Sequence, residues 1–281
     1  MNKKQSVAVL YFCTGTYDRY RSGFYDSSEK YFFSDQDIEK HYYVRTDSKW
    51  LLSQNLPNVT FIYQEALWRP KQTLYRFRIF LSQKNKLKNH DYIVFFNANF
   101  EFKNKVNMEE FLPYWNKNYM ALLHFSYFDK QPDIFPYERN SHSQAYIPYG
   151  SGQHYYLWAL NGWKSNAYLD LCKKCDDLIN QDELKYIVAI WHDESILNKF
   201  FLGRTDIKNL DISYWYPEAG WFSKFPVKII SRSKEIFVWS KDKLRNSTNP
   251  KVSLSKKIYI KLVYYINRLI YSSRSIFKFF Y

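Results

Sequence analysis

Short apolar runs alternate with helical segments over the first hundred residues, and this alternation limits the possible folds more than any other feature of the chain. Residues 7–12, 41–45, 59–63 and 92–96 are β-branched or aromatic runs of the length of buried strands. Residues 25–33 and 72–87 carry apolar side chains at helical spacing. Strands that alternate with helices form βαβ units, so the sequence predicts an α/β fold with a largely parallel sheet covered on both faces.

The pattern is less regular in the second half of the chain. We expect an aromatic strand at residues 154–160, helices at 167–180 and 182–190, and a further helical apolar face at 196–201. The chain has neither G-x-G-x-x-G nor G-x-x-x-x-G-K-[ST]. This argues against a dinucleotide-binding Rossmann site and against a P-loop.

Two polar motifs are candidates for chemistry. Asn97-Ala98-Asn99 follows the strand at 92–96, at the end of the strand where open α/β sheets bind ligands. The same motif also occurs in simple turns. Asp193 and Glu194, in the segment WHDES, open a helix, where carboxylates serve as caps and favour the helix dipole. Alternatively, one of them lies beside a reacting anomeric carbon, because glycosyl transfer needs an ionised carboxylate there.

The net charge of +14 is unevenly distributed. Residues 251–281 contain seven Lys or Arg and no acidic residue, which is half of the total. Their apolar and basic residues fall on different faces of a helix, so the tail, residues 246–281, is expected to bind a membrane surface or to pack on protein. A nucleic-acid binder would also be basic, but its charge should not concentrate in one terminal helix. We therefore expect no nucleic acid as a partner.

The three cysteines, Cys13, Cys172 and Cys175, are too few for a disulfide framework. Cys172 and Cys175 form a C-x-x-C without a second pair, so we interpret them as two residues on one helix face and not as a zinc or redox site. Reduced thiols fit a cytoplasmic setting. The apolar run near the N-terminus is too short for a secretory signal, and no run is long enough to span a bilayer.

Several separated motifs together resemble glycosyltransferase family 6, the family of the blood-group A and B transferases, the α-1,3-galactosyltransferases and their bacterial relatives. The resemblance extends from about residue 7 to about residue 243. The motifs are Phe12-x-Thr14-x-x-Tyr17, Trp68 with residues 73–77, residues 95–99, Tyr137-Glu138-Arg139, residues 144–148, Tyr155-Tyr156 and residues 191–199.

This resemblance implies a GT-A fold over residues 1–245, an α/β architecture with a Rossmann-like mixed central sheet, helices on both faces, a nucleotide-sugar half and an acceptor half. It implies a retaining transfer of galactose or N-acetylgalactosamine from a UDP-sugar to the 3-OH of a galactoside. The residues that it assigns to the donor are Phe12, Thr14, Tyr17, Trp68, Arg76, Asn97, Asn99 and Lys234.

The resemblance also assigns the reacting groups. Glu194 would be the catalytic carboxylate, either as a nucleophile or as a stabiliser of the cationic state, and Asp193 would hold a donor-sugar hydroxyl. The acceptor would contact His124, Trp191 and Glu218. Leu157 and Ala159 would select the donor sugar: Leu157 is the type that favours N-acetylgalactosamine, whereas Ala159 is closer to the galactose type. A fucosylated acceptor fits by analogy.

One departure from the family predicts the absence of a metal cofactor. Animal members have Asp-x-Asp where this chain has Asn97-Ala98-Asn99, and neutral amides are far poorer ligands of divalent cations than carboxylates. Positive side chains would then offset the charge of the leaving UDP. The candidates are Arg76, Lys234, Lys241, Lys243 and Arg245.

The expected partners are a UDP-sugar donor, a galactoside or lipid-linked glycan acceptor, and the inner face of a membrane contacted through the tail. The rival interpretation is a non-catalytic relative that binds glycans without turnover.

Overall fold

The computed structural model describes residues 4–67, 70–113, 115–218 and 226–233, and every structural statement below concerns these residues. Trp68, Lys234, Lys241, Lys243, Arg245 and the whole tail 246–281 lie outside them, so the roles expected of these residues stay predictions. Within the described ranges, no helix is both long and apolar enough to cross a bilayer.

Seven strands form the central sheet in the order β3-β2-β1-β4-β7-β6-β8, and β5, β10 and β9 form a small second sheet. The strands are β1 (Gln5–Cys13), β2 (Ile38–Thr46), β3 (Val59–Tyr63), β4 (Tyr92–Phe96), β5 (Phe100–Phe102), β6 (Tyr119–Leu123), β7 (Tyr156–Lys164), β8 (Ile207–Leu210), β9 (Tyr216–Pro217) and β10 (Ile229–Ser231). The first four strands of the central sheet are mutually parallel, and β7 runs antiparallel to both β4 and β6. The predicted α/β fold is therefore confirmed as a mixed sheet.

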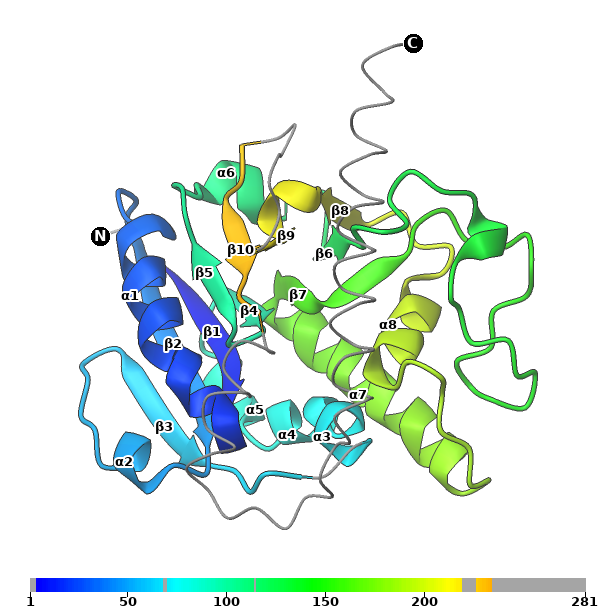
Figure 1. Cartoon of the computed structure of the whole chain (residues 1–281), viewed down its shortest axis with the longest axis horizontal. Helices are drawn as coiled ribbons and strands as arrows, with labels where there is room; N and C mark the ends of the chain where they lie inside the picture. Colours follow the sequence, from blue (N-terminus) through cyan, green and yellow to red (C-terminus); the bar gives the residue numbers. More distant parts are fainter. Residues whose placement is uncertain (1–3, 68–69, 114, 219–225, 234–281) are drawn as a thin grey trace, which may run out of the picture. The chain divides into compact units, whose positions relative to one another are not determined.

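The helices of the described residues flank this sheet (Figure 1). The α-helices are α1 (Arg21–Tyr31), α2 (Lys49–Leu52), α3 (Lys71–Leu74), α4 (Arg76–Leu81), α5 (Lys84–Leu87), α6 (Met108–Phe111), α7 (Ser165–Glu183) and α8 (Asp193–Phe201). Three short 3₁₀ turns are η1 (Gly15–Tyr20), η2 (Pro132–Ile134) and η3 (Ile212–Tyr214). The single helix expected at 72–87 is thus three short helices in sequence.

Alternation along the central strands explains why both faces of the sheet are covered. Side chains of successive strand residues point to opposite faces. Tyr11 of β1 and Phe96 of β4 contact Phe24 of α1, with ring centroids 4.6 and 5.5 Å apart. Their neighbours Phe12 and Phe95 contact Phe80 of α4 on the other face, at 5.5 and 5.6 Å. The continuous apolar runs in the sequence therefore reflect strands that are buried on two sides.

The helix predicted at 182–190 is wrong. α7 already ends at Glu183, and Tyr186 takes a left-handed φ of 57°. The N–H groups of Tyr186 and Ile187 donate to the carbonyls of Glu183 and Asp182, a hydrogen-bond pattern that closes a helix. Leu184, Tyr186, Val188 and Ile190 are all more than half exposed, so the apolar pattern that suggested a buried helix does not face the core.

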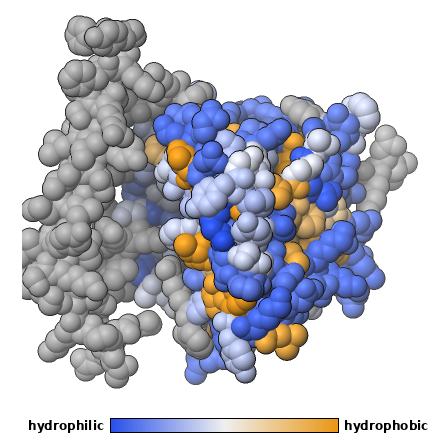
Figure 2. Space-filling model, turned by 90° about the vertical axis from the view of Figure 1, so that its right-hand side faces the viewer, coloured by the Kyte–Doolittle hydropathy of each residue, from blue (hydrophilic) through white to orange (hydrophobic). Residues whose placement is uncertain are grey.

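The strand expected at 154–160 is β7, which starts at Tyr156 and continues to Lys164. Cys172 and Cys175 are buried on α7, which confirms that they belong to one core-facing helix face. Figure 2 shows the side of the molecule on which the segment between β6 and β7 lies. Apolar residues form small, separate areas there within a mainly hydrophilic surface.

Asp182 ties the end of α7 to the segment before β7. Its buried carboxylate accepts hydrogen bonds from the Ser143 hydroxyl and the Gln144 N–H, both at 2.7 Å. Asp182→Ala leaves these two donors without an acceptor, so we expect the free energy of unfolding to fall by about 1–3 kcal/mol. Chemical denaturation measures this change. Asp177→Ala, at an exposed position of the same helix, is the matched control and should change it by less than about 0.5 kcal/mol.

Candidate active site

Most of the described site candidates lie near one edge of the central sheet. β1, β2 and β4 are parallel, so their carboxyl ends share this edge. β7 runs the other way, and its first residues pair with the end of β6, where Leu123 lies opposite Tyr156. The residues that follow β1, β4 and β6 therefore meet the residues that begin β7. This is the edge at which open α/β sheets bind ligands.

Asp193 and Glu194 enter this edge from the start of α8. His192 immediately before them has a φ of 52°, a left-handed conformation that side-chain-bearing residues seldom adopt. A hydrogen bond of 3.0 Å joins its Nδ1 to the Thr73 hydroxyl. Strained backbone of this kind persists only where the surroundings hold it, and it is concentrated at functional sites. Here it turns the first residues of the helix inward.

Arg76 and Asp193 form an ion pair. Arg76 Nη1 lies 2.9 Å from Asp193 Oδ2, and both side chains are largely buried. The guanidinium also lies over the rings of Phe12 and Phe95, 5.9 and 5.3 Å from their centroids. Burial raises the pKa of Asp193 to about 6, although the Arg76 charge and backbone N–H groups favour the ionised form. Two residues predicted separately for the donor sugar are thus in direct contact.

Glu194 is held through both of its carboxylate oxygens. Oε1 accepts a hydrogen bond of 2.8 Å from the Tyr155 hydroxyl, and Oε2 accepts one of 2.9 Å from the Trp158 N–H. Burial raises the pKa of Glu194 to about 7, whereas these two hydrogen bonds lower it. The carboxylate is therefore fixed in orientation and poised to change its charge near neutral pH.

Tyr155 and the Trp158 N–H are partners of Glu194 that the sequence analysis missed. Tyr155 appeared only as part of a Tyr-Tyr motif, and a backbone N–H leaves no trace in a sequence. Asp47 was missed as well, although it follows a predicted strand. Its Oδ1 accepts from the N–H of Gly15, whose φ of 58° suits glycine, at 2.8 Å. This contact fixes the turn between Phe12 and Tyr17.

The nucleotide-binding candidates follow β1. Phe12 is partly buried beside Arg76, and Thr14 is buried, with its hydroxyl 3.4 Å from Gln72 Nε2. Tyr17 lies in the 3₁₀ turn η1 and is partly exposed. These three residues line up along the sheet edge next to the Arg76–Asp193 pair.

The two asparagines differ in their surroundings. Asn97 is partly exposed, and its side chain makes no hydrogen bond to another described residue. Asn99 is buried, and its Nδ2 donates to the Ser231 hydroxyl at 3.0 Å and to the Arg232 carbonyl at 2.8 Å. The expectation that both amides point into the ligand crevice therefore suits Asn97 but not Asn99, which anchors the end of β10.

This donor set fits a divalent cation poorly. Mg²⁺, Mn²⁺ and Ca²⁺ prefer several oxygen ligands, with carboxylates among them. Asn99 Oδ1 is a buried oxygen without a hydrogen-bond partner, but its neighbour in the motif is a second neutral amide. Across the ranges that the structure covers, no cluster of three or more His, Cys, Asp or Glu side chains could hold a metal ion.

The acceptor candidates lie on both sides of Glu194. His124 follows β6, its ring lies 5.5 Å from that of Tyr155, and burial lowers its pKa to about 4, so it is neutral at pH 7. Trp191 is half exposed and can offer a ring face to a sugar. Glu218, in contrast, accepts hydrogen bonds from Arg232 Nε at 3.2 Å and the Ser233 N–H at 2.7 Å. Its carboxylate is already engaged within the protein.

The donor-selecting candidates lie at the start of β7. Leu157 is partly buried and Ala159 is buried, and the Ala159 carbonyl accepts the Asn97 N–H at 2.9 Å. Trp158 between them points to the core, where it packs against Phe77 and Phe95. Leu157 pairs with Leu122 of β6, and the register between β6 and β7 shifts between Leu157 and Asn161, so Ala159 lies in an irregular part of the strand.

A mixed sheet whose ligand-binding edge carries two buried carboxylates, one paired with arginine, has groups suited to stabilising positive charge on a bound substrate. Comparison with known proteins identifies the class more closely. The model of glycosyltransferase family 6 matches residues 1–241, and the chain belongs to this family. The architecture is accordingly a GT-A fold, and the protein is a glycosyltransferase.

Three relatives illustrate the range of the family. The chain is 31% identical over 233 residues to the O-antigen biosynthesis glycosyltransferase WbnI of Escherichia coli, which covers 83% of this chain and 97% of the relative. It is 28% identical over 221 residues to globoside α-1,3-N-acetylgalactosaminyltransferase 1 of Gallus gallus, and the match covers 76% of this chain and 62% of the relative. It is 32% identical over 133 residues to histo-blood group ABO system transferase 2 of Rattus norvegicus, and the match covers 47% of this chain and 38% of the relative. The matched part is thus less than two thirds of either animal relative.

Tyr155→Phe tests whether the hydroxyl at this position sets the charge of Glu194. The substitution keeps the ring and removes one hydrogen bond to the carboxylate, so the pKa of Glu194 should rise further. Loss of about 1.5 kcal/mol of charge-assisted hydrogen bonding corresponds to about one pH unit. The acidic limb of the profile of log(kcat/KM) against pH should therefore move upward by about that amount. Tyr186→Phe, at a fully exposed tyrosine, should leave the profile unchanged, and an unchanged profile in Tyr155→Phe would refute the role.

Proposed function

We propose that this chain is a retaining glycosyltransferase that moves N-acetylgalactosamine or galactose from a UDP-sugar to a galactoside in α-1,3 linkage. The main support is that two hydrogen bonds fix the Glu194 carboxylate next to the Arg76–Asp193 ion pair. The names of relatives support the type of reaction, since they include an α-1,3-N-acetylgalactosaminyltransferase and a blood-group transferase. A fucosylated galactoside is the acceptor that we would try first.

Each charged group has a distinct part in this proposal. The Glu194 carboxylate faces the anomeric carbon, where positive charge develops as the bond to UDP breaks. It either forms a covalent bond to the sugar or stabilises the cation while the acceptor attacks from the same face. Asp193 accepts a hydrogen bond from a sugar hydroxyl, and Arg76 orients Asp193 and adds positive charge near the diphosphate.

We further propose that the transfer needs no divalent metal. The support is the donor set at the Asn pair, in which Asn97 is neutral and Asn99 holds β10. Arg76, with Lys234 and the basic residues Lys241, Lys243 and Arg245 beyond the described ranges, would supply the positive charge that a metal supplies elsewhere.

The choice of donor rests on the start of β7. Leu157 is of the type that goes with N-acetylgalactosamine, whereas Ala159, which is buried next to the Asn97 backbone, is closer to the galactose type. We favour N-acetylgalactosamine over galactose because of Leu157.

Glu194→Gln tests the catalytic assignment. The amide is nearly the same size but carries no charge in the cationic transition state, so we expect kcat to fall by about 10²–10⁴-fold. The assay is release of UDP from UDP-N-acetylgalactosamine and from UDP-galactose with a fucosylated galactoside. Glu39→Gln, at an exposed position of β2, is the control and should retain the wild-type rate. Wild-type turnover in Glu194→Gln would refute the assignment, and no turnover of the wild-type chain would favour a glycan-binding relative without catalysis.

Chelation tests the metal-free proposal. Because Asn97 and Asn99 offer no carboxylate, we expect the same initial rate with excess EDTA as with added Mn²⁺. The complementary variant Asn97→Asp should gain at most a modest response to Mn²⁺, since Asn99 remains occupied by β10. If the wild-type chain turned over only with Mn²⁺, this part of the proposal would be wrong while the catalytic assignment of Glu194 would stand.

A further inference from the structure

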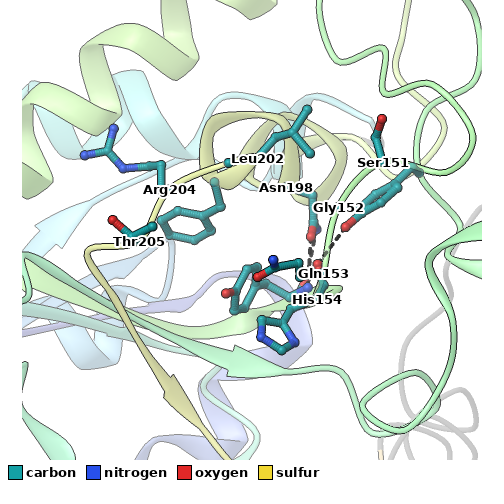
Figure 3. Close-up of a pocket in the computed structure, with 12 residues that line it drawn as sticks. Ser151, Gly152, Gln153, His154, Asn198, Leu202, Arg204 and Thr205 are labelled. Carbon is teal, nitrogen blue, oxygen red and sulfur yellow. Dashed lines mark hydrogen bonds between the residues drawn. The ribbon is translucent and has the colours of Figure 1, made fainter.

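A hollow of about 420 Å³ opens beside the carboxyl-terminal end of α8 (Figure 3). It is bounded by the loop at residues 151–154, the end of α8 and the loop at residues 203–205. Of the residues that the structure describes, none of those assigned above to the donor or the acceptor lines it. Its volume falls within the range of about 300–1,000 Å³ found for small-molecule sites.

The walls of the hollow are fixed by specific contacts. The Tyr137 hydroxyl donates to the His154 carbonyl at 2.6 Å, a contact drawn in Figure 3. Gly152 has a φ of 92°, and a Cβ there would lie 2.5 Å from the Tyr137 hydroxyl oxygen, so only glycine fits this close approach. Asn198 closes the inner side, since its side chain bonds the backbone of Tyr156 and the carbonyl of Glu194. The walls of the hollow, which lies next to α8, are therefore fixed by hydrogen bonds and close packing.

The side chains around the hollow present uncommitted polar groups. Those of Ser151, Gln153, His154 and Thr205 make no hydrogen bond to any described residue. Burial lowers the pKa of His154, so its imidazole is neutral at pH 7 and can both donate and accept. In Figure 3, Thr205 lies at the left and Ser151 at the upper right, with Gln153 and His154 below and between them.

The charged side chains around the hollow indicate which class of ligand it can bind. Among the described residues, no carboxylate lines the hollow, which disfavours a cation. The charged residue in this described lining, Arg204, is bound by Asp206 through two hydrogen bonds of 3.0 Å, which disfavours an anion. Buried Phe201 and Tyr156 add apolar surface. Hydroxyl, amide and imidazole groups around an apolar floor suit a neutral ligand rich in hydroxyl groups.

We propose that this hollow is a second saccharide-binding subsite, which takes one or two neutral sugar units that do not react. Binding of the saccharide depends only on the groups described here. Its use for a distant part of the acceptor glycan, one helical turn from Glu194, rests on the proposed function.

Lactose, a neutral disaccharide, is the probe. We would titrate it into the full-length chain carrying Glu194→Gln, with isotope-labelled Leu methyl groups, and follow Leu202 at the hollow and Leu52 on distant α2. The Leu202 methyl signals should shift with saturation, and those of Leu52 should not. Thr205→Trp fills the opening from an exposed loop and should weaken the Leu202 response at least tenfold, and Gln153→Ala with His154→Ala should weaken it similarly. Asn55→Trp, at an exposed position before β3, is the matched control and should bind as the parent does.

Two outcomes would overturn the subsite: no Leu202 shift at millimolar lactose, or equal shifts in Thr205→Trp and Asn55→Trp. The Trp191 indole signal reports the acceptor position separately and should respond in both variants. If the wild-type chain transferred sugar but Leu202 did not respond, only the subsite would fail. If Leu202 responded but no transfer occurred with any donor, only the proposed function would fail.

Discussion

The site depends on the two hydrogen bonds that fix the Glu194 carboxylate. A buried carboxylate is costly unless its oxygens are paired, and here both partners, the Tyr155 hydroxyl and the Trp158 N–H, come from the start of β7. Asp193 in turn requires Arg76, which comes from α4 in the other half of the chain. Two adjacent acidic residues thus join a helix, a strand and a distant arginine. Their raised pKa values follow from the same burial that makes them useful near a developing positive charge.

The antiparallel direction of β7 brings Tyr155 and Trp158 to the ligand-binding edge, where they contact Glu194. This strand lies between β4, the last parallel strand of the first half, and β6. Its first residues extend beyond the end of β4 and pair with the end of β6, where Tyr156 lies opposite Leu123. Its amino-terminal residues therefore contact Asn97 after β4, His124 after β6 and Glu194 on α8. A strand parallel to β4 at this position would have placed its carboxyl end, and not its amino end, at the ligand-binding edge of the sheet.

The aromatic runs of the first hundred residues were sufficient to predict four parallel strands, because a strand buried on both faces is apolar throughout. The helical segments between the first and second and between the third and fourth of these strands were predicted as well, the latter as one helix where there are three, whereas α2 was missed. The second half was harder. β6 and β8 were missed because they are short, with five and four residues. Residues 182–190 misled the prediction because Leu184, Tyr186, Val188 and Ile190 are exposed, and periodicity reports a buried face only where the apolar side chains are in fact buried.

The sequence by itself determined the class of fold, the family and the identities of the charged residues, since these depend on local patterns and on motifs of fixed spacing. The tertiary structure decided which of these residues meet. It paired Arg76 with Asp193 across more than a hundred residues, gave Glu194 a backbone donor that no side chain encodes, and directed Asn99 and Glu218 to the end of β10. Hydrogen bonds between residues distant in sequence depend on strand order and register, and these are properties of the folded sheet as a whole.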